Sequence, residues 1–100
     1  MEEYFVYILA GRKKGDLYVG MAKNLKWRVS EHKNGLRNGF TEKNKVKKMV
    51  YYEQCDGKES AVLREKQLKK WNKSWKIRLI EKFNPKWKDL YSDLDSTIAE

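Results

Sequence analysis

Cysteine, histidine and proline are scarce in this sequence, with one residue of each among 100. The single cysteine, Cys55, excludes an intrachain disulfide and a structural zinc site made by several cysteines of one chain. No run approaches the roughly 18 apolar residues of a membrane span, and the Met1-Glu2-Glu3 start lacks the basic and apolar regions of a signal peptide. These absences predict a cytoplasmic protein that does not associate with membranes.

Acidic residues are also too few to balance the basic ones, and the formal net charge is +9. Three acidic residues and no basic residue fall in the last ten positions, so residues 1–90 carry 23 basic against 11 acidic side chains. Such an excess favours polyanions, because each phosphate neutralised by Lys or Arg releases condensed counterions. A well-charged surface without a nucleic-acid partner is the alternative that composition alone leaves open.

The strand signals are three short runs of aromatic and β-branched residues. Tyr4–Ala10 and Asp16–Gly20 flank a loop, Gly11–Gly15, whose glycines suit a hairpin. In an antiparallel hairpin two tyrosines of these runs, Tyr7 and Tyr18, lie near one another although ten residues separate them. Val46–Cys55 predicts a third strand that completes a small sheet.

Helical patterns separate and follow these strands. Asn24 can accept hydrogen bonds from the first turn of a helix that carries Arg28 and His32 on one face, four residues apart. Glu59–Trp71 consists mainly of good helix formers, and Trp75–Phe83 repeats an apolar helical spacing. The expected fold is therefore α+β, with a three-stranded, mainly antiparallel sheet flanked by helices in the order ββαβαα.

Glu65 lies beside the apolar side of the second predicted helix, where a carboxylate needs a partner. An ion pair with Lys69, four residues later, is the simpler explanation from spacing alone. A divalent ion is the other explanation, since Mg²⁺ is often bound by one carboxylate together with water and phosphate oxygens.

The ordered set of these residues resembles the GIY-YIG nuclease superfamily. Phe5-Val6-Tyr7 and Tyr18-Val19-Gly20 match its two paired tripeptides, Asn24 to His32 matches its first helix, and Ala61 to Lys69 matches the helix with its metal-binding Glu. The likeness covers roughly residues 4–90 and is closest to small stand-alone bacterial members, related to the nuclease domain of the excision-repair incision subunit. It implies a nuclease domain over residues 1–91, followed by a flexible acidic tail over residues 92–100.

The resemblance also implies a site and a reaction. Glu65 would hold one Mg²⁺ or Mn²⁺ ion, Arg28 would stabilise the phosphate, and Tyr7, Tyr18 and His32 would orient or deprotonate water. The base stays open between Tyr18 and His32. The resemblance gives supporting roles to Gly20 and Asn84, the latter also explained as an ordinary helix C-cap before Pro85.

Two positions depart from the family pattern. Phe5 replaces the Gly of the first tripeptide, a position that many relatives also vary. Met21 follows Gly20 where the DNA-repair incision subunits carry a Lys, so any cationic help would have to come from another residue, such as Lys23.

The implied substrate is a nucleic acid, with DNA preferred and RNA not excluded. Phosphate contacts are expected from basic residues of the first half of the chain, among them Lys23, Lys26, Lys33, Arg37, Lys43 and Lys45. The sequence contains no additional base-reading module, which predicts selection by nucleic-acid shape or by a partner protein. The alternative function is a catalytically silent nucleic-acid-binding module that recruits or regulates a partner.

Overall fold

Three antiparallel strands form a sheet in which β1 (Glu3–Ala10) lies between β2 (Leu17–Ala22) and β3 (Lys48–Asp56). The computed structural model describes residues 3–11, 15–33, 48–91 and 94, with the backbone alone for residues 31–33. Residues 6–10 of β1 are all buried, because a central strand of a sheet covered on both faces exposes neither side to water. The continuous apolar run of β1 thus accounts for its middle position.

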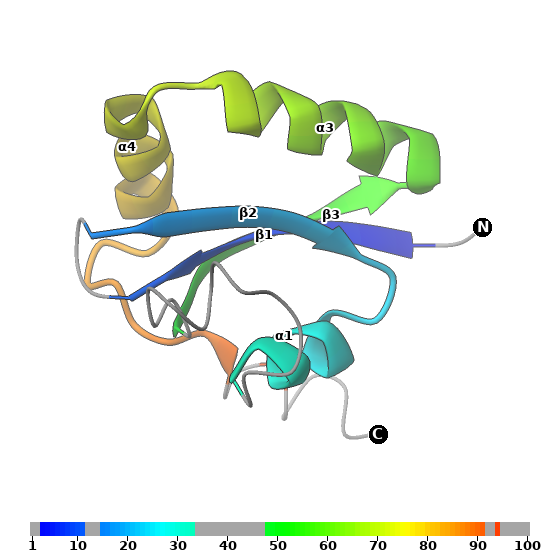
Figure 1. Ribbon diagram of the computed structural model, residues 1–100, viewed down its shortest axis with the longest axis horizontal. Helices are drawn as coiled ribbons and strands as arrows, with labels where there is room; N and C mark the ends of the chain where they lie inside the picture. Colours follow the sequence, from blue (N-terminus) through cyan, green and yellow to red (C-terminus); the bar gives the residue numbers. More distant parts are fainter. Residues whose placement is uncertain (1–2, 12–14, 34–47, 92–93, 95–100) are drawn as a thin grey trace.

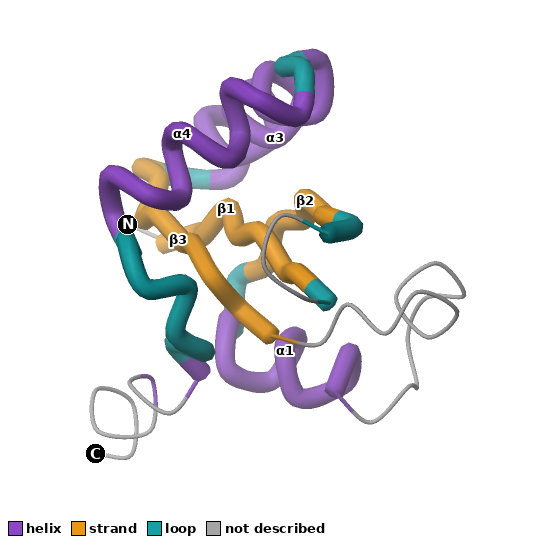
Figure 2. The backbone as a smooth tube through the Cα atoms, turned by 90° about the vertical axis from the view of Figure 1, so that its left-hand side faces the viewer, coloured by secondary structure: helices purple, strands orange, loops and turns teal. Residues whose placement is uncertain are grey.

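Helices cover both faces of this sheet (Figures 1 and 2). One helix, α1 (Leu25–Lys33), lies against one face, while α3 (Lys58–Lys70) and α4 (Lys73–Phe83) lie against the other. The apolar residues of successive strand positions point alternately to the two faces, so each face receives its own set of helices. The result is a sheet between two helical layers.

Asparagine side chains begin two of the helices. The Asn24 carboxamide oxygen accepts the backbone N–H of Trp27 at 2.9 Å at the start of α1. Asn72 accepts that of Trp75 at 2.9 Å at the start of α4. Each bond satisfies a donor that a helix N-terminus leaves without an intrahelical partner, which is why Asn is favoured there.

Two apolar cores follow from this arrangement. One core lies between the sheet and α1, and we call it the α1 face. It consists of Tyr7, Leu9, Ala22, Leu25, Val29, Met49, Leu90 and Leu94. The core that we call the α3–α4 face consists of Val6, Ile8, Ala10, Val19, Val50, Tyr51, Ala61, Leu68, Ile80 and Trp87.

The chain after α4 returns along the outer edge of β3. The Leu90 N–H donates to the Met49 carbonyl at 2.7 Å, and the Met49 N–H donates to the Asp89 carboxylate at 3.1 Å. These bonds cover an edge that would otherwise present unpaired backbone groups. The segment after α4 thereby passes from the α3–α4 face to the α1 face, as the left side of Figure 1 shows.

The predicted fold class and element order are confirmed. The sheet is antiparallel with flanking helices, and the order is ββαβαα. β2 continues past Gly20 to Ala22, because Met21 and Ala22 still pair with Val6 and Phe5 of β1. No helix in the described part of the chain is long and apolar enough to cross a membrane.

Candidate active site

Tyr7 and Gly20 pair directly across β1 and β2, and the Tyr7 ring lies over the glycine. A Cβ atom at position 20 would lie 2.5 Å from the Tyr7 hydroxyl and 2.7 Å from Cζ of its ring. It would also lie 3.1 Å from Cε2 of Tyr18, whose ring centroid is 6.4 Å from that of Tyr7. Glycine is therefore required for the two rings to meet, and the hairpin brings both phenols to the α1 face.

The two tyrosines differ in their access to water. Tyr7 is only 1% exposed, whereas Tyr18 is partly exposed at the margin of the same core. Tyr18 is thus a half-buried strand residue, whereas Tyr7 belongs to the buried core. Of the two phenols, Tyr18 is the one that a water molecule reaches more easily.

Arg28 comes to the same edge of the sheet from α1. Its Nη1 atom donates to the backbone carbonyl of Met21 at 3.2 Å, and Met21 directly follows Gly20 in β2. Leu25 and Val29 bury the neighbouring side of the helix, which fixes the direction in which Arg28 extends. Arg28 is therefore a partly buried, oriented side chain beside β2 and not a freely moving surface residue.

Glu65 approaches from the opposite face of the sheet. Ala61 and Leu68 point into the core from α3, and Arg64 reaches Glu53 on β3 at 3.1 Å. Successive helix residues turn by about 100°, so Glu65 lies on the other side of this buried line from Arg64, away from Glu53. β2 is the edge strand opposite β3.

The Glu65 carboxylate has a cationic neighbour in this structure. Lys69 Nζ lies 3.3 Å from its Oε2 atom, at the i to i+4 spacing expected of a helical ion pair. The Glu65 side chain is 20% exposed and that of Lys69 is 54% exposed. Separating Lys69 from Glu65 costs little free energy, because exposed ion pairs of this kind contribute at most about 1 kcal/mol.

The single carboxylate of Glu65 suits a divalent ion that keeps most of its water ligands better than an ion held mainly by protein side chains. Within the described residues, no group of three or more His, Cys, Asp and Glu side chains gathers in one place. A site based on Glu65 would therefore complete its coordination with water and substrate oxygens, which is the habit of Mg²⁺. Zinc or calcium sites formed by three or more such side chains are therefore not found in the described part of the chain.

Several predicted site residues lie at or beyond the limits of the described chain. The backbone of His32 and Lys33 belongs to α1, but their side chains are not described. Arg37, Lys43 and Lys45 lie outside the described residues. Lys23 and Lys26 lie at and near the start of α1, exposed and half-buried respectively.

Asn84 is buried and makes three hydrogen bonds on the β3 side of the sheet. Its amide donates to the carbonyls of Val50 at 3.1 Å and Lys88 at 2.9 Å, and its oxygen accepts the Lys88 N–H at 3.1 Å. Its backbone also ends α4 by donating to Ile80. The C-cap interpretation is thus observed, while a supporting role in the site stays a prediction.

A second polar cluster was not predicted from the sequence. The Tyr51 hydroxyl donates to Glu53 at 2.6 Å, and Arg64 Nε donates to both oxygens of that carboxylate at 3.1 Å. Burial, followed by the bond to Glu53, raises the pKa of Tyr51 well above its ordinary value. Burial also raises the pKa of the nearby Cys55 thiol, which packs against the α3–α4 face. Because Glu53 and Arg64 are widely separated in the sequence, no local pattern predicts that they pair.

Comparison with protein families decides the family. A model of the GIY-YIG catalytic domain matches residues 3–78, which include β1, β2, α1, β3, α3 and the beginning of α4. The chain belongs to the GIY-YIG family. The match spans the tripeptide strands together with Arg28 and Glu65, so the resemblance seen in the sequence is confirmed.

Its relatives are small bacterial proteins of similar length. A UPF0213 protein of Staphylococcus saprophyticus subsp. saprophyticus is 34% identical over 80% of this chain and 96% of its own length. A UPF0213 protein of Staphylococcus aureus strain Mu3 is 35% identical over 81% of this chain and 98% of its own length. No solved structure matches. These names specify no substrate, but membership in the GIY-YIG family implies nuclease-type activity on a nucleic acid.

Proposed function

We propose that this GIY-YIG protein is a Mg²⁺- or Mn²⁺-dependent endonuclease that hydrolyses DNA phosphodiester bonds and selects its substrate by structure. Two features support the proposal: the Arg28 guanidinium bonds to the Met21 carbonyl of β2 at 3.2 Å, and helix geometry directs Glu65 toward the same strand from the other face of the sheet. A domain that only folds and binds needs no such convergence. A cytoplasmic location and a role in DNA repair belong to the same proposal.

Arg28 stabilises the reacting phosphate in this proposal. Its planar guanidinium presents donors in a fixed geometry that matches phosphate oxygens, which gain charge during in-line displacement. The bond to the Met21 carbonyl holds the guanidinium at β2, at the residue that follows Gly20. Orientation before substrate arrives lowers the entropic cost of the reaction.

Glu65 is the residue that would hold the divalent ion. When bound, the ion supplies charge neutralisation at the leaving oxygen and orients the phosphate. Glu65 would exchange its contact with Lys69 for that ion, while Lys69 turns toward solvent or a substrate phosphate.

Tyr18 or His32 accepts the proton of the attacking water. A phenol with an ordinary pKa of about 10 is a poor base at neutral pH unless a cation lowers that pKa, whereas an ordinary imidazole has a pKa of about 6.5. Tyr18 borders Gly20 and is partly exposed, which supports its contact with water. Tyr7, almost fully buried, orients Tyr18 and shapes the surface over Gly20.

Substrate selection in this proposal depends on shape and charge. Lys23 and Lys26 border the Arg28 side of the site, and phosphate contacts of this kind position a strand without reading its sequence. The modest size of the domain favours branched or partly single-stranded DNA, or a partner protein that presents the DNA.

Cleavage of labelled single-stranded, duplex, flapped and branched DNA in Mg²⁺, Mn²⁺ or EDTA tests the proposal. The wild type should cut at least one substrate only with a divalent ion, and Glu65→Ala and Arg28→Ala should each lose about 100-fold or more. Glu59→Ala, which removes an exposed carboxylate from the first turn of the same helix, should cleave normally. Tight binding without cleavage by all of these proteins would contradict the proposal and favour the silent binding module.

A further inference from the structure

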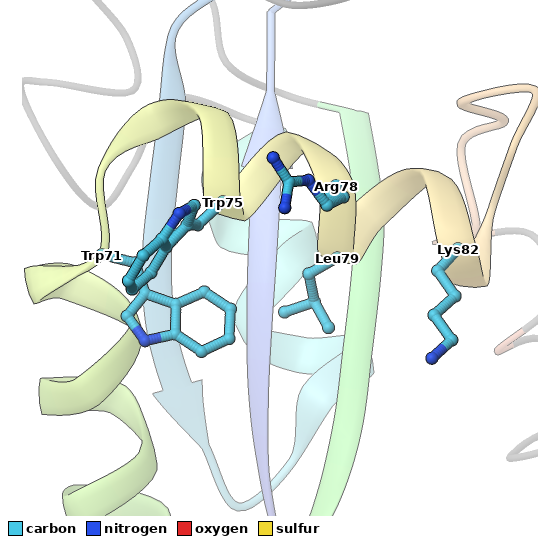
Figure 3. A pocket seen from close by; sticks show the side chains of 5 residues that line it. All are labelled: Trp71, Trp75, Arg78, Leu79 and Lys82. Carbon is cyan, nitrogen blue, oxygen red and sulfur yellow. The ribbon is translucent and has the colours of Figure 1, made fainter.

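A hollow of about 250 Å³ lies where α3 ends and α4 begins, away from the residues discussed above. It is lined by Trp71, Trp75, Arg78, Leu79 and Lys82, and we call it the Trp groove (Figure 3). The two indoles lie together at one end of the groove, Leu79 lies between, and Lys82 lies at the other end. The groove thus combines flat apolar surfaces with cationic side chains.

The aromatic end of the Trp groove is held in place from behind. Arg64 lies 5.4 Å from the ring centroid of Trp71, and Glu53 fixes Arg64 through its two hydrogen bonds. Trp71 in turn meets Trp75 edge-on, with centroids 5.8 Å apart and planes at 85°. Trp75 remains 50% exposed. An exposed ring on a fixed support loses little conformational freedom when it binds a flat ligand.

The electrostatic surroundings of the Trp groove favour an anionic ligand. Residues 58–83, which include α3 and α4, contain nine basic and three acidic side chains. Two of the basic ones, Arg78 and Lys82, line the groove itself. Flat aromatic rings combined with cations are the features by which proteins bind single-stranded nucleic acid, whose bases stack while its phosphates contact Lys and Arg.

The Trp groove begins at the C-terminal end of α3, the helix that carries Glu65. Trp71 follows Glu65 by six residues, a rise of about 9 Å along a helix, and the two residues extend from different sides of it. Glu65 and the Trp groove thus belong to one helix and the turn that follows it.

We propose that the Trp groove binds an unpaired base of the nucleic-acid strand next to the cleaved bond, stacked on Trp75, with Arg78 and Lys82 contacting flanking phosphates. The inference rests on the proposed function and narrows its substrate to DNA with a single-stranded segment beside the cleavage site. A perfect duplex keeps its bases inside the helix and therefore offers nothing to Trp75.

Binding measured in EDTA tests the groove separately from cleavage. The probes are a labelled oligothymidylate of about 12 nucleotides and an abasic oligomer with the same number of phosphates. Trp75→Ala should weaken oligothymidylate binding about tenfold and leave abasic binding unchanged, because only a base can stack. Leu63→Ala, which removes an exposed apolar side chain from α3 outside the groove, should change neither. Equal binding of oligothymidylate by Trp75→Ala and wild type would overturn the inference.

Two further variants keep the result interpretable. Trp75→Leu retains apolar bulk without a ring, so it should lose base-dependent binding even if Trp75→Ala folds poorly. Lys82→Ala should weaken both oligomers alike, since it removes a phosphate contact. Glu65→Ala should keep full Trp75-dependent binding while losing cleavage. Cleavage by the wild type with no effect of Trp75→Ala or Trp75→Leu on binding would refute the groove and leave the nuclease proposal standing.

Discussion

Each face of the sheet buries one tyrosine, and the two tyrosines have different surroundings. On the α3–α4 face, the Tyr51 hydroxyl bonds to a carboxylate that Arg64 also holds. On the α1 face, Tyr7 lies over Gly20 and beside Tyr18, at an edge strand that Arg28 also reaches. The first arrangement fixes a helix on the sheet, whereas the second packs two tyrosine rings against a glycine of the strand that Arg28 contacts. Burial of a phenol alone therefore does not mark a reactive site.

The largest expected effect on this comparison comes from Asn84→Ala on the α3–α4 side. The change removes three hydrogen bonds to the backbone, of which the one to Val50 is buried, and leaves a cavity, so unfolding in urea should show a loss of about 2–4 kcal/mol. Asn72→Ala, which removes only the exposed cap of the same helix, should cost about 1 kcal/mol. Equal losses in the two variants would contradict the structural role given to Asn84.

Gly20→Ala should disrupt the packing of the α1 face. The new methyl group collides with the Tyr7 ring, and forced repacking of this kind costs about 1–3 kcal/mol in thermal or urea unfolding. Adding Tyr7→Phe removes the hydroxyl contact and should recover part of that loss. Gly57→Ala is the control: nothing lies within 4 Å, so its cost arises only from a backbone φ of +91°. An unchanged stability of Gly20→Ala would refute the close packing described for Tyr7.

Glu53→Gln should show that the α3–α4 cluster around Glu53 contributes to stability and not to the chemical step. It replaces the carboxylate that bonds Tyr51 and Arg64, so the free energy of unfolding should fall by about 1–2 kcal/mol. Cleavage per folded molecule at saturating DNA should change little, because Glu53 contacts neither Glu65 nor Arg28, whereas DNA binding should weaken because Arg64 supports Trp71. A large loss of cleavage with normal stability would place catalytic chemistry on the wrong face.

The smallest effect is a dependence on alkaline pH. Burial and the bond to Glu53 raise the pKa of Tyr51 in the folded protein, so its contribution to stability is complete below the unfolded value of about 10. As pH rises above that value, the unfolded state loses the phenol proton first and stability falls. Tyr51→Phe should fall less steeply than wild type in urea titrations above pH 10. Parallel curves would mean that the phenol is not held in its neutral form.

The sequence predicts the strands and helices well because their signals are local. The apolar run of β1, the Asn24 cap and the helix formers of α3 each act within a few residues. The approach of Tyr7 to Tyr18 is also predicted, since a hairpin brings the two strands together. The pairing of Glu53 with Arg64 does not, because it depends on which strand α3 crosses.

The Trp groove shows the same limit on sequence prediction. Trp71 ends one predicted helix and Trp75 begins the next, and nothing in the sequence alone shows that the two rings meet. The feature of the sequence that indicates the groove is the presence of two Trp residues, four positions apart, across the start of a helix. It becomes informative only once α4 is seen to turn back beside the end of α3, so that Arg78 and Lys82 join the two rings.

The most direct test of the central claim is Mn²⁺-induced broadening of backbone amide signals in a ¹⁵N NMR spectrum, with wild type and Glu65→Gln compared. If Glu65 and the β2 edge share one site, Mn²⁺ should broaden the amides around Glu65 and those of Gly20 and Met21 together. Glu65→Gln should abolish both effects, while Glu59→Gln should leave them intact. Broadening confined to α3, or broadening that survives in Glu65→Gln, would contradict a single site formed from both faces of the sheet.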